Sequence, residues 1–370
     1  MTFNKIKVCI VEDSEFYRAY LSRLLTQDSA FQICGQAATG TAALPIIAEQ
    51  RPDVIVMDLH LPDVNKFELL NKVVAYFDIP IIVVSSLEEE SIHALELGAS
   101  DFLPKVSTDN ATELKNFATM LQIKLKVLAG VHTRTSRNDL DKIKAKVKGA
   151  ATYPDVYLTD KSPFNTEGKP SKKLIAIGAS LGGVEATLLL LESLPETLPG
   201  IIVVQHMPPG FTKAYAQRLN KNTKFKVREA TSGDVVEDGL VLVASGGNQL
   251  RIKRTAKGFV VQESLEAPVN GFCPSVDVVF HSVAKEAGKD ALGIILTGIG
   301  SDGAQGMKAM HDAGAHTLGQ NKQSCAVYGM PQAAMKLGAI DIEGNIAEIS
   351  KDVATYFAQY IKGKRIGEGI

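Results

Sequence analysis

The sequence is poor in cysteine and places none of it in a binding motif. The four cysteines are widely separated and form no C-x-x-C pair: they are Cys9, Cys34, Cys273 and Cys325. Both a disulfide framework and a zinc site are recognised by cysteines at regular or short spacings. The scatter therefore argues against both and favours a reducing compartment, so a cytoplasmic location is expected.

An excess of charge of one sign is also missing. Lys and Arg total 40 and Asp and Glu total 41, so the formal net charge is -1 over 370 residues. Nucleic-acid binding needs concentrated positive charge, and no nucleic-acid partner is expected. No apolar run approaches the roughly 18 residues that cross a bilayer, and the first apolar stretch is too short for a signal peptide. Direct membrane insertion is therefore not expected.

The apolar runs predict two α/β domains joined by a polar linker. Short β-branched runs at 7–11, 52–58 and 79–86 alternate with helical patterns, and weaker strand candidates lie at 31–37 and 99–105. A second series has the strand candidates LIAIGA, GIIVVQH, GLVLVAS, GFVVQES, ALGIILTG and HTLGQ. This alternation is typical of doubly wound parallel sheets. The predicted parts are a first domain at 1–130, a linker at 131–172, a second domain at 173–362 and a tail at 363–370.

Acidic and polar residues follow the strands of the first segment. Glu12 and Asp13 follow the first strand, and Asp58 closes the third. Because the carboxyl ends of parallel strands share one edge of a sheet, we expect these acids to meet there with Ser85 and Lys105. Three carboxylates in one place repel one another, and a divalent cation such as Mg²⁺ relieves that repulsion. An aspartate beside the cation can accept a phosphoryl group, whose oxygens a lysine and a hydroxyl can hold.

Over nearly its whole length this first segment resembles the receiver domain of two-component response regulators. The resemblance implies that Asp58 is the phosphoacceptor and that Glu12 and Asp13 bind Mg²⁺ beside it. It also implies that three residues respond to the phosphoryl group: Ser85, Lys105 and Phe102. After LPDV the family usually has Asp-Gly, whereas this chain has Asn65 and Lys66, a change that bears on the rate of dephosphorylation.

The second segment opens on KLIAIGASLGG, an apolar run followed by a turn of small residues. Two designs begin in this way. The G-x-G-x-x-G dinucleotide fingerprint is met at Gly178 and Gly183, but its third position is Ser180. The G-x-S-x-G nucleophile turn is met in full by Gly178, Ser180 and Gly182.

The later strands favour the nucleophile. A dinucleotide site requires Asp or Glu at the end of the second strand, whereas IIVVQH ends in His206, which suits a general base. A third strand, ALGIILTG, runs toward Asp302, a carboxylate that can orient the imidazole. Ser180, His206 and Asp302 thus form a candidate acyl-transfer triad. Amides at the start of the helix after Ser180, or in the 297–303 loop, could serve as an oxyanion hole.

Several motifs of the second segment resemble the catalytic domain of the chemotaxis protein-glutamate methylesterases. GASLGG, VVQHMPPGFT, FCPSVDVVF, LTGIGSDGAQGM and AVYGMPQAAM occur in that family's order and spacing, over most of residues 173–340. The resemblance implies a Rossmann-like domain without a cofactor, the triad Ser180, His206 and Asp302, and the amide of Ile299 as oxyanion donor. It implies hydrolysis of glutamate methyl esters on methyl-accepting chemotaxis receptors, and deamidation of receptor glutamines by the same chemistry.

The whole chain, receiver included, resembles the phosphorylation-regulated enzymes of that family. The implied phosphodonor is a chemotaxis histidine kinase, and the unphosphorylated receiver would cover the active site until acylphosphate at Asp58 relieves this. Several positions of the second segment depart from the family pattern: Leu181 replaces Thr after the nucleophile, Cys273 replaces Arg before Pro-Ser, SGGNQL replaces Pro-Pro-Gly-x-His-Leu, and Ile299 replaces Met. These departures bear on the rate and on the substrate.

Other interpretations of the second segment stay open at this point. An α/β-hydrolase has the order Ser, acid, His, which would pair Asp302 with His311 or His316. The output domain could instead be a catalytically weakened protein-binding module, with Leu181 and Cys273 as signs of drift. A nucleotide-binding domain that uses the Gly178–Gly183 turn is the third alternative.

Overall fold

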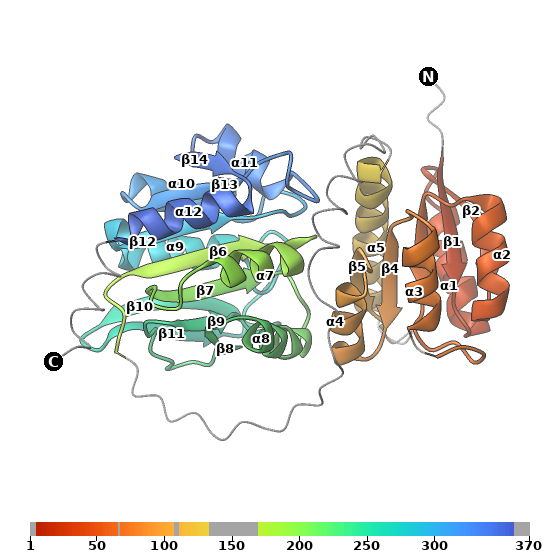
Figure 1. The fold of residues 1–370 in the computed structure, drawn as a ribbon, viewed down its shortest axis with the longest axis horizontal. Helices are drawn as coiled ribbons and strands as arrows, with labels where there is room; N and C mark the ends of the chain where they lie inside the picture. Colours follow the sequence, from red (N-terminus) through yellow and green to blue (C-terminus); the bar gives the residue numbers. More distant parts are fainter. Residues whose placement is uncertain (1–4, 66, 107–110, 133–168, 359–370) are drawn as a thin grey trace. The chain divides into compact units, whose positions relative to one another are not determined.

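The computed structural model describes residues 5–65, 67–106, 111–132 and 169–358. The chain divides into two compact units, one built around a five-stranded sheet and the other around a seven-stranded sheet (Figure 1). Each unit is described by itself. Most of the predicted linker at 131–172 and all of the predicted tail at 363–370 lie outside the described residues.

The five-stranded unit has the strand order β2-β1-β3-β4-β5. Its strands are β1 (Ile6–Val11), β2 (Phe31–Ala37), β3 (Val54–Met57), β4 (Ile81–Ser85) and β5 (Asp101–Pro104). β1 pairs in parallel with β2 and β3, and β3 pairs in parallel with β4. Every residue of β3 and β4 is buried, as continuous apolar strands covered on both faces should be.

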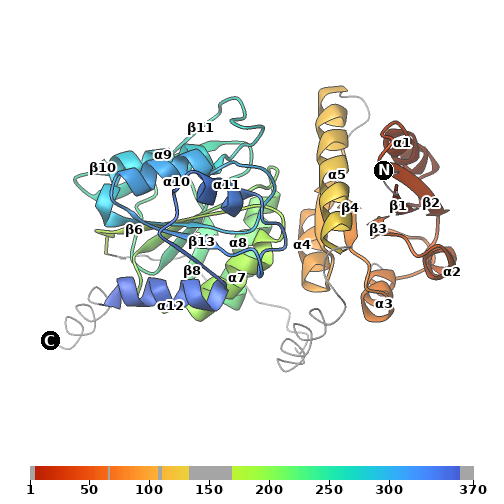
Figure 2. The same cartoon turned by 90° about the horizontal axis from the view of Figure 1, so that it is seen from above.

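Helices lie on both faces of this sheet. They are α1 (Glu15–Thr26), α2 (Gly40–Gln50), α3 (Glu68–Tyr76), α4 (Glu88–Glu96) and α5 (Ala111–His132). Figure 2 shows α1 and α5 on one face and α2 and α3 on the other. The first two helices begin at side-chain caps: Ser14 Oγ accepts from the Tyr17 amide at 3.3 Å, and Thr39 Oγ1 from the Ala42 amide at 3.2 Å.

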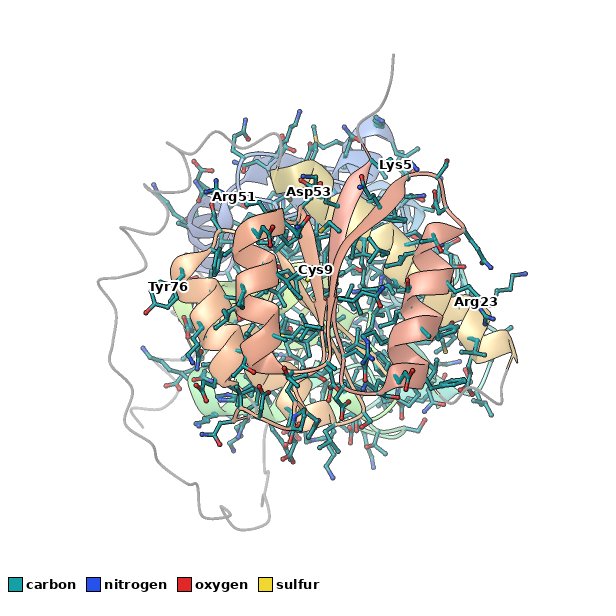
Figure 3. The ribbon with its side chains drawn as sticks, turned by 90° about the vertical axis from the view of Figure 1, so that its right-hand side faces the viewer. Lys5, Cys9, Arg23, Arg51, Asp53 and Tyr76 are labelled. Atoms are coloured by element: carbon teal, nitrogen blue, oxygen red, sulfur yellow. The ribbon has the colours of Figure 1, made fainter. Side chains whose placement is uncertain are left out.

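The thiol of Cys9 belongs to the core of this sheet. Figure 3 shows it inside the unit, whereas Arg23 and Tyr76 lie at the surface, the latter 79% exposed. Burial raises the pKa of Cys9 to about 12, so this thiol is not a nucleophile at neutral pH. All four cysteines are free.

The seven-stranded sheet has the order β14-β13-β12-β6-β7-β9-β8. Its strands are β6 (Leu174–Ala179), β7 (Gly200–Gln205), β8 (Lys226–Glu229), β9 (Leu240–Val243), β12 (Ala291–Ile295), β13 (His316–Gln320) and β14 (Ile342–Gly344). All of its pairings are parallel. After β6, the chain adds β7, β8 and β9 on one side of that strand, and it then returns to add β12, β13 and β14 on the other side. The topological switch point, where such sheets bind ligands, therefore lies between β6 and β12.

Helices cover both faces of this sheet as well. They are α7 (Gly183–Ser193), α8 (Phe211–Asn222), α9 (Val276–Glu286), α10 (Ala304–Asp312), α11 (Met330–Lys336) and α12 (Ile346–Tyr356), with a short 3₁₀ helix at Gly288–Asp290. In Figure 2, α9, α10 and α11 lie on one face and α7, α8 and α12 on the other. The predicted class, two doubly wound parallel-sheet α/β domains, is confirmed. No helix in the described part of the chain is long and apolar enough to cross a membrane.

One predicted strand of the second segment lies outside the parallel sheet. GFVVQES forms β11 (Gly258–Ser264), which pairs antiparallel with β10 (Gln249–Thr255) in a separate hairpin. β10 was not predicted because its sequence, QLRIKRT, is rich in charged residues and lacks the continuous apolar run that marks the strands of the parallel sheet. β8 and β14 were also not predicted, since each is short and largely polar.

Candidate active site

Three loops of the seven-stranded unit meet at the carboxyl edge of its sheet. β6 pairs with β7 through Ala179 opposite Gln205, so Ser180 and His206 leave adjacent strands at the same level. On the other side of β6, the Ser180 amide donates to the carbonyl of Thr297, two residues after β12, at 3.0 Å. The predicted nucleophile thus stands at the switch point, between the predicted base and the loop that leads to Asp302.

Ser180 is held by backbone contacts in a tight turn. Its carbonyl accepts from the Gly183 amide at 2.8 Å and from Nε2 of Gln205 at 2.7 Å. Gly182 has a φ of 75°, which is the left-handed region, and a Cβ there would lie 2.6 Å from the Cβ of Ala326. The turn therefore needs glycine at this position for both conformation and space.

His206 and Asp302 form a buried pair. Nε2 of His206 lies 2.8 Å from Oδ2 of Asp302, and the two side chains are 5% and 0% exposed. The carboxylate accepts the Nε2 proton, which leaves Nδ1 as the basic nitrogen. Nδ1 is buried and has no hydrogen-bond partner among the described residues. The structure brings the predicted base and acid together but shows no hydrogen bond from Ser180 to His206.

The carboxylate of Asp302 accepts hydrogen bonds from side chains and from the backbone. Besides His206, its donors are Asn270 Nδ2 at 2.8 Å, Ser275 Oγ at 2.7 Å, the Val276 amide at 2.7 Å and, more weakly, the Asp277 amide at 3.4 Å. Burial raises the pKa of Asp302, but the hydrogen bond and charge of His206 and the other donors outweigh it and hold that pKa below its ordinary value. The carboxylate is therefore ionised at neutral pH and able to stabilise an imidazolium.

Three residues near this pair were missed in the sequence. Asn270 and Ser275 bond Asp302, and the ring of Phe272 stacks on the ring of His206 with centroids 3.6 Å apart. The sequence holds one signal for them: Asn270-Gly271 is a dipeptide typical of tight turns. Nothing in the pattern indicates that this turn reaches a histidine more than 60 positions earlier in the chain.

The loop after β12 is packed directly against the nucleophile. A Cβ at Gly298 would lie 2.9 Å from the Cβ of Ser180 and would clash with Sδ of Met330. Ile299, the predicted oxyanion donor, is the next residue. Oγ1 of Thr297 donates to the Leu181 carbonyl at 2.9 Å, which fixes the two loops to each other. Leu181 itself is buried, with 2% of its surface exposed.

Gly298→Ala should disturb this contact. We expect a loss of about 1–3 kcal/mol in the free energy of unfolding, because an added methyl group must displace the Ser180 turn or Met330. Gly319→Ala is the matched control in β13, since its nearest contacts are side-chain atoms of Ile340 at 3.3–3.4 Å. Urea unfolding of the two variants measures the difference. Equal stability losses would contradict the packing described.

The alternative bases have other partners. Nδ1 of His316 lies 3.2 Å from Oδ2 of Asp341, and its Nε2 lies 2.7 Å from Oδ2 of Asp352. Nε2 of His311 lies 3.3 Å from Oδ1 of Asp341. His316 is the first residue of β13, whereas Asp302 follows the last residue of the neighbouring parallel strand β12, so the two residues lie at opposite edges of the sheet. The pairing of Asp302 with His206 therefore does not follow the α/β-hydrolase order.

The five-stranded unit has an acidic cluster at the carboxyl edge of its sheet. Ligand atoms of Glu12, Asp13 and Asp58 all lie within 4.8 Å of one another, and the cluster could hold a metal ion. Oε2 of Glu12 is buried without a hydrogen-bond partner among the described residues. Burial raises the pKa of Glu12 to about 7, against the lowering effect of its hydrogen bond and ion pair with Lys105. An unpartnered oxygen and three carboxylates are the donor set that suits a hard divalent cation.

Lys105 joins this cluster from the end of β5. Its Nζ lies 2.7 Å from Oδ2 of Asp58 and 2.9 Å from Oε1 of Glu12. Burial lowers the pKa of Lys105, but the hydrogen bonds with the two carboxylates outweigh it and raise that pKa. Ser85 is the last residue of β4 and is fully buried, and Phe102 lies buried in β5.

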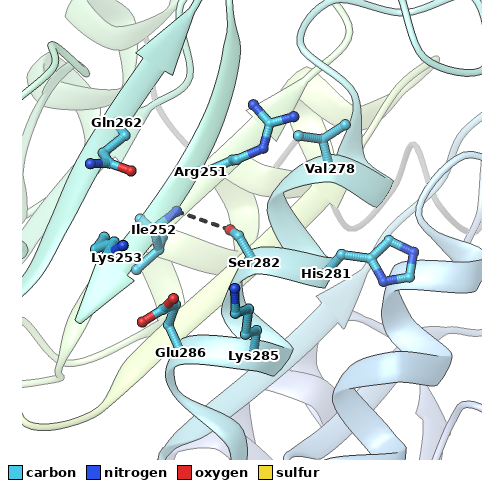
Figure 4. A pocket seen from close by; sticks show the side chains of 9 residues that line it. All are labelled: Arg251, Ile252, Lys253, Gln262, Val278, His281, Ser282, Lys285 and Glu286. Atoms are coloured by element: carbon cyan, nitrogen blue, oxygen red, sulfur yellow. Dashed lines mark hydrogen bonds between the residues drawn. The ribbon is translucent and has the colours of Figure 1, made fainter.

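A pocket elsewhere in the seven-stranded unit is not part of the triad region. It has a volume of about 430 Å³ and lies between the β10–β11 hairpin and α9 (Figure 4). Lys253, His281 and Lys285 line it, and none of the predicted catalytic residues does. Two of its lining residues are joined by a hydrogen bond from the Ile252 amide to Ser282 Oγ at 2.9 Å.

The chain is similar to known protein families, to named proteins and to a solved structure. The family model described as CheB methylesterase matches residues 175–353, and the model described as response regulator receiver domain matches residues 8–116. The protein-glutamate methylesterase/protein-glutamine glutaminase 2 of Syntrophomonas wolfei is 38% identical over 341 residues, which is 92% of this chain and 94% of that protein. The chain belongs to the protein-glutamate methylesterase family.

Other members of the methylesterase family match at similar identity. A protein named protein-glutamate methylesterase/protein-glutamine glutaminase 3 from Burkholderia lata is 37% identical over 96% of each chain. The protein of that name from Salmonella typhimurium, without a number, is 36% identical over 95% of this chain and 96% of its own. The crystal structure of the Thermotoga maritima CheB methylesterase catalytic domain covers 50% of this chain and 98% of its own, with 31% identity and a TM-score of 0.49.

Proposed function

We propose that this methylesterase-family protein is a phosphorylation-activated serine esterase that hydrolyses glutamate methyl esters on methyl-accepting chemotaxis receptors. The observation that carries the proposal is the buried pair of His206 and Asp302, 2.8 Å apart, at the same sheet edge as the Ser180 turn. A base, an oriented carboxylate and a serine in a glycine turn are the parts that acyl transfer needs. The relatives are named protein-glutamate methylesterase/protein-glutamine glutaminase, which supplies the substrate class.

In the proposed acylation, Ser180 Oγ attacks the ester carbonyl carbon while Nδ1 of His206 takes the hydroxyl proton. Nδ1 is the acceptor because Nε2 already bonds Asp302. The tetrahedral intermediate then expels the methoxide oxygen, which receives the proton from His206 and leaves as methanol. The Asp302 carboxylate stabilises the imidazolium while it holds this proton.

In the proposed deacylation, a water molecule attacks the glutamyl-serine ester and gives a proton to His206. Collapse of the second tetrahedral intermediate returns that proton to Ser180 and releases a glutamate carboxylate. The amide of Ile299 is the proposed oxyanion donor, because Gly298 packs its loop against Ser180. A glutamine side chain can follow the same course with ammonia as the leaving group, which gives the glutaminase activity named in the relatives.

The five-stranded unit is the proposed regulator. Asp58 would accept a phosphoryl group from a chemotaxis histidine kinase, with Glu12 and Asp13 holding Mg²⁺ beside it. When bound, the Mg²⁺ would neutralise charge on the phosphoryl oxygens. Lys105, now bonded to Asp58, and Ser85 at the end of β4 would hold those oxygens, and Phe102 would respond to the change. The unphosphorylated receiver would restrain the esterase.

The proposed parts of the chain are a receiver domain at 1–130, a linker at 131–172, a catalytic domain at 173–362 and a tail at 363–370. A cytoplasmic location belongs to it as well, since the kinase and the methylated parts of receptors must both be reached. No cofactor is proposed for the catalytic domain. A catalytically weakened binding module is the less favoured alternative, because it gives no role to the hydrogen bonds that hold Asp302 beside His206.

Asp58→Asn should abolish the response to phosphorylation and leave basal hydrolysis. We expect a small phosphodonor with Mg²⁺ to raise methanol release by the unaltered protein by about 5- to 150-fold, the usual range of coupling between two sites. The variant should show no rise. Asp28→Asn is the matched control, because Asp28 lies in the same unit and pairs with Lys126 away from the acidic cluster. Stimulation of Asp58→Asn equal to that of the control would contradict the regulatory part alone.

A further inference from the structure

A two-residue turn beside the triad has a conformation that few residues can adopt. The amide of Val269 donates to the carbonyl of Phe272 at 3.0 Å, and the amide of Phe272 returns a bond to Val269 at 2.9 Å. The central residues Asn270 and Gly271 have φ values of 54° and 84°. Positive φ at both central positions defines a mirror-image turn that favours Asn-Gly. Counted over its four residues, Val269 to Phe272, the turn fixes the directions of the second and fourth side chains, those of Asn270 and Phe272.

Asn270 bridges two buried carboxylates. Its Nδ2 lies 2.8 Å from Oδ1 of Asp302 and 2.7 Å from Oδ2 of Asp277. One amide nitrogen carries two hydrogens, so it can donate to both. Asp302 and Asp277 are 1% and 7% exposed. Burial and, to a lesser extent, the nearby charge of Asp302 raise the pKa of Asp277.

Phe272 covers the other member of the pair. Its ring lies flat on the imidazole of His206, with centroids 3.6 Å apart and an angle of 6° between the planes. A face-to-face ring at this distance excludes water from one side of the imidazole and restricts its rotation. An aromatic face is also favourable for the imidazolium that forms during acyl transfer.

We propose that Asn270 and Phe272, the second and fourth residues of this turn, are positioning residues for the triad: Asn270 holds Asp302 and Phe272 holds His206. Both act through another residue and neither is a catalytic residue. One rigid turn thereby fixes the position of Asp302 relative to His206. The inference rests on the esterase function proposed above.

A merely structural role for the turn would predict a different set of effects. Loss of packing alone lowers stability and the folded fraction, while the folded molecules keep their kcat. Loss of positioning lowers kcat and leaves KM unchanged, because the contact matters most when charge develops on the imidazole. The two roles also differ in whether the effects depend on Asp302.

Phe272→Leu removes the ring and keeps an apolar side chain. We expect kcat for methanol release from methylated receptor to fall about three- to tenfold with KM unchanged. Phe272→Tyr keeps the stack and should stay within about twofold of the unaltered protein. Leu265→Ala is the control from the same loop, since Leu265 is 88% exposed and should be neutral.

Asn270→Gly removes the amide and keeps a residue that tolerates positive φ. We expect kcat to fall about tenfold or more, the effect of a lost hydrogen bond to a charged group. In an Asp302→Asn background the same change should have little further effect, because Asn270 acts through that carboxylate. An equal loss in both backgrounds would overturn the positioning role of Asn270.

Nuclear magnetic resonance gives a readout that does not depend on the esterase activity. The carbon-bound ring protons of His206 should lie upfield in the unaltered full-length protein, because the ring of Phe272 shields them. They should move downfield in Phe272→Leu and stay in place in Phe272→Tyr. If these shifts appear but no protein releases methanol, the proposed function fails and the turn geometry stands. If the shifts are absent, or kcat of Phe272→Leu equals that of the unaltered protein, the inference is overturned.

Discussion

Ser180→Ala should abolish methanol release from methylated receptor. The expected loss in kcat is at least about 10³-fold, because removal of a serine nucleophile leaves only the contribution of binding and the oxyanion donors. Ser180 is only partly buried and leaves β6 in a turn fixed by Gly183 and Gln205, so loss of its hydroxyl should not disturb folding. Release of methanol by headspace chromatography, with the melting temperature measured beside it, tests both statements.

Ser193→Ala is the matched control for this change. Ser193 ends α7, and its hydroxyl donates to the Leu190 carbonyl at 2.8 Å, away from the strand ends of the triad. It should keep full activity. If Ser180→Ala retained more than about a tenth of the kcat, another nucleophile would be required and the proposed mechanism would be wrong.

Asp302→Asn combines a large loss of activity with a loss of stability. The expected fall in kcat is about 10³- to 10⁴-fold, because an amide cannot stabilise the imidazolium and favours the wrong tautomer of His206. The amide nitrogen would also face donors from Asn270, Ser275 and the Val276 backbone. At least one buried donor then loses its acceptor, at a cost of about 1–3 kcal/mol in the free energy of unfolding.

The difference in unfolding free energy between the unaltered protein and Asp302→Asn should decrease at acidic pH. The pKa of Asp302 is lowered in the folded protein, so its carboxylate stabilises the fold fully above the unfolded-state value of about 3.9. That contribution is lost as the pH falls through the folded-state pKa. The gap in unfolding free energy between the unaltered protein and Asp302→Asn should therefore be constant at neutral pH and shrink below about pH 4.

Asp312→Asn is the control for both measurements, the kcat and the pH dependence of the unfolding free energy. Asp312 ends α10, its side chain is 57% exposed, and it pairs with Lys308 one turn earlier. Its replacement should leave kcat unchanged, and because its ion pair is exposed to solvent, it should alter stability at low pH far less than Asp302→Asn does. A stability gap for Asp302→Asn that widened at low pH, or full activity of that variant, would contradict the assignment of Asp302.

The parallel sheets could be predicted because burial on both faces makes their strands apolar throughout. VIVM in β3 and LIAIGA in β6 are fully buried in the structure, and both runs are visible in the sequence. The strand ends were predictable for the same reason. Once the strands are placed, Ser180, His206 and Asp302 must leave the sheet at one edge.

The contacts made by irregular loops could not be predicted. Asn270 reaches Asp302 and Phe272 reaches His206 across segments that no local pattern connects. β10 lacks the continuous apolar run of the parallel strands, so it was not recognised, whereas GFVVQES of β11 begins with an apolar run and its sequence does not separate it from a strand of the main sheet. The choice of Nε2 as the nitrogen that bonds Asp302 depends on the orientation of a ring, which sequence does not encode locally.

Methanol release from methylated receptor by the full-length protein, with and without a small phosphodonor and Mg²⁺, tests the central claim most directly. The account predicts slow release without the phosphodonor and faster release with it, both lost in Ser180→Ala. Absence of methanol under both conditions, from protein that is folded and phosphorylated on Asp58, would contradict it.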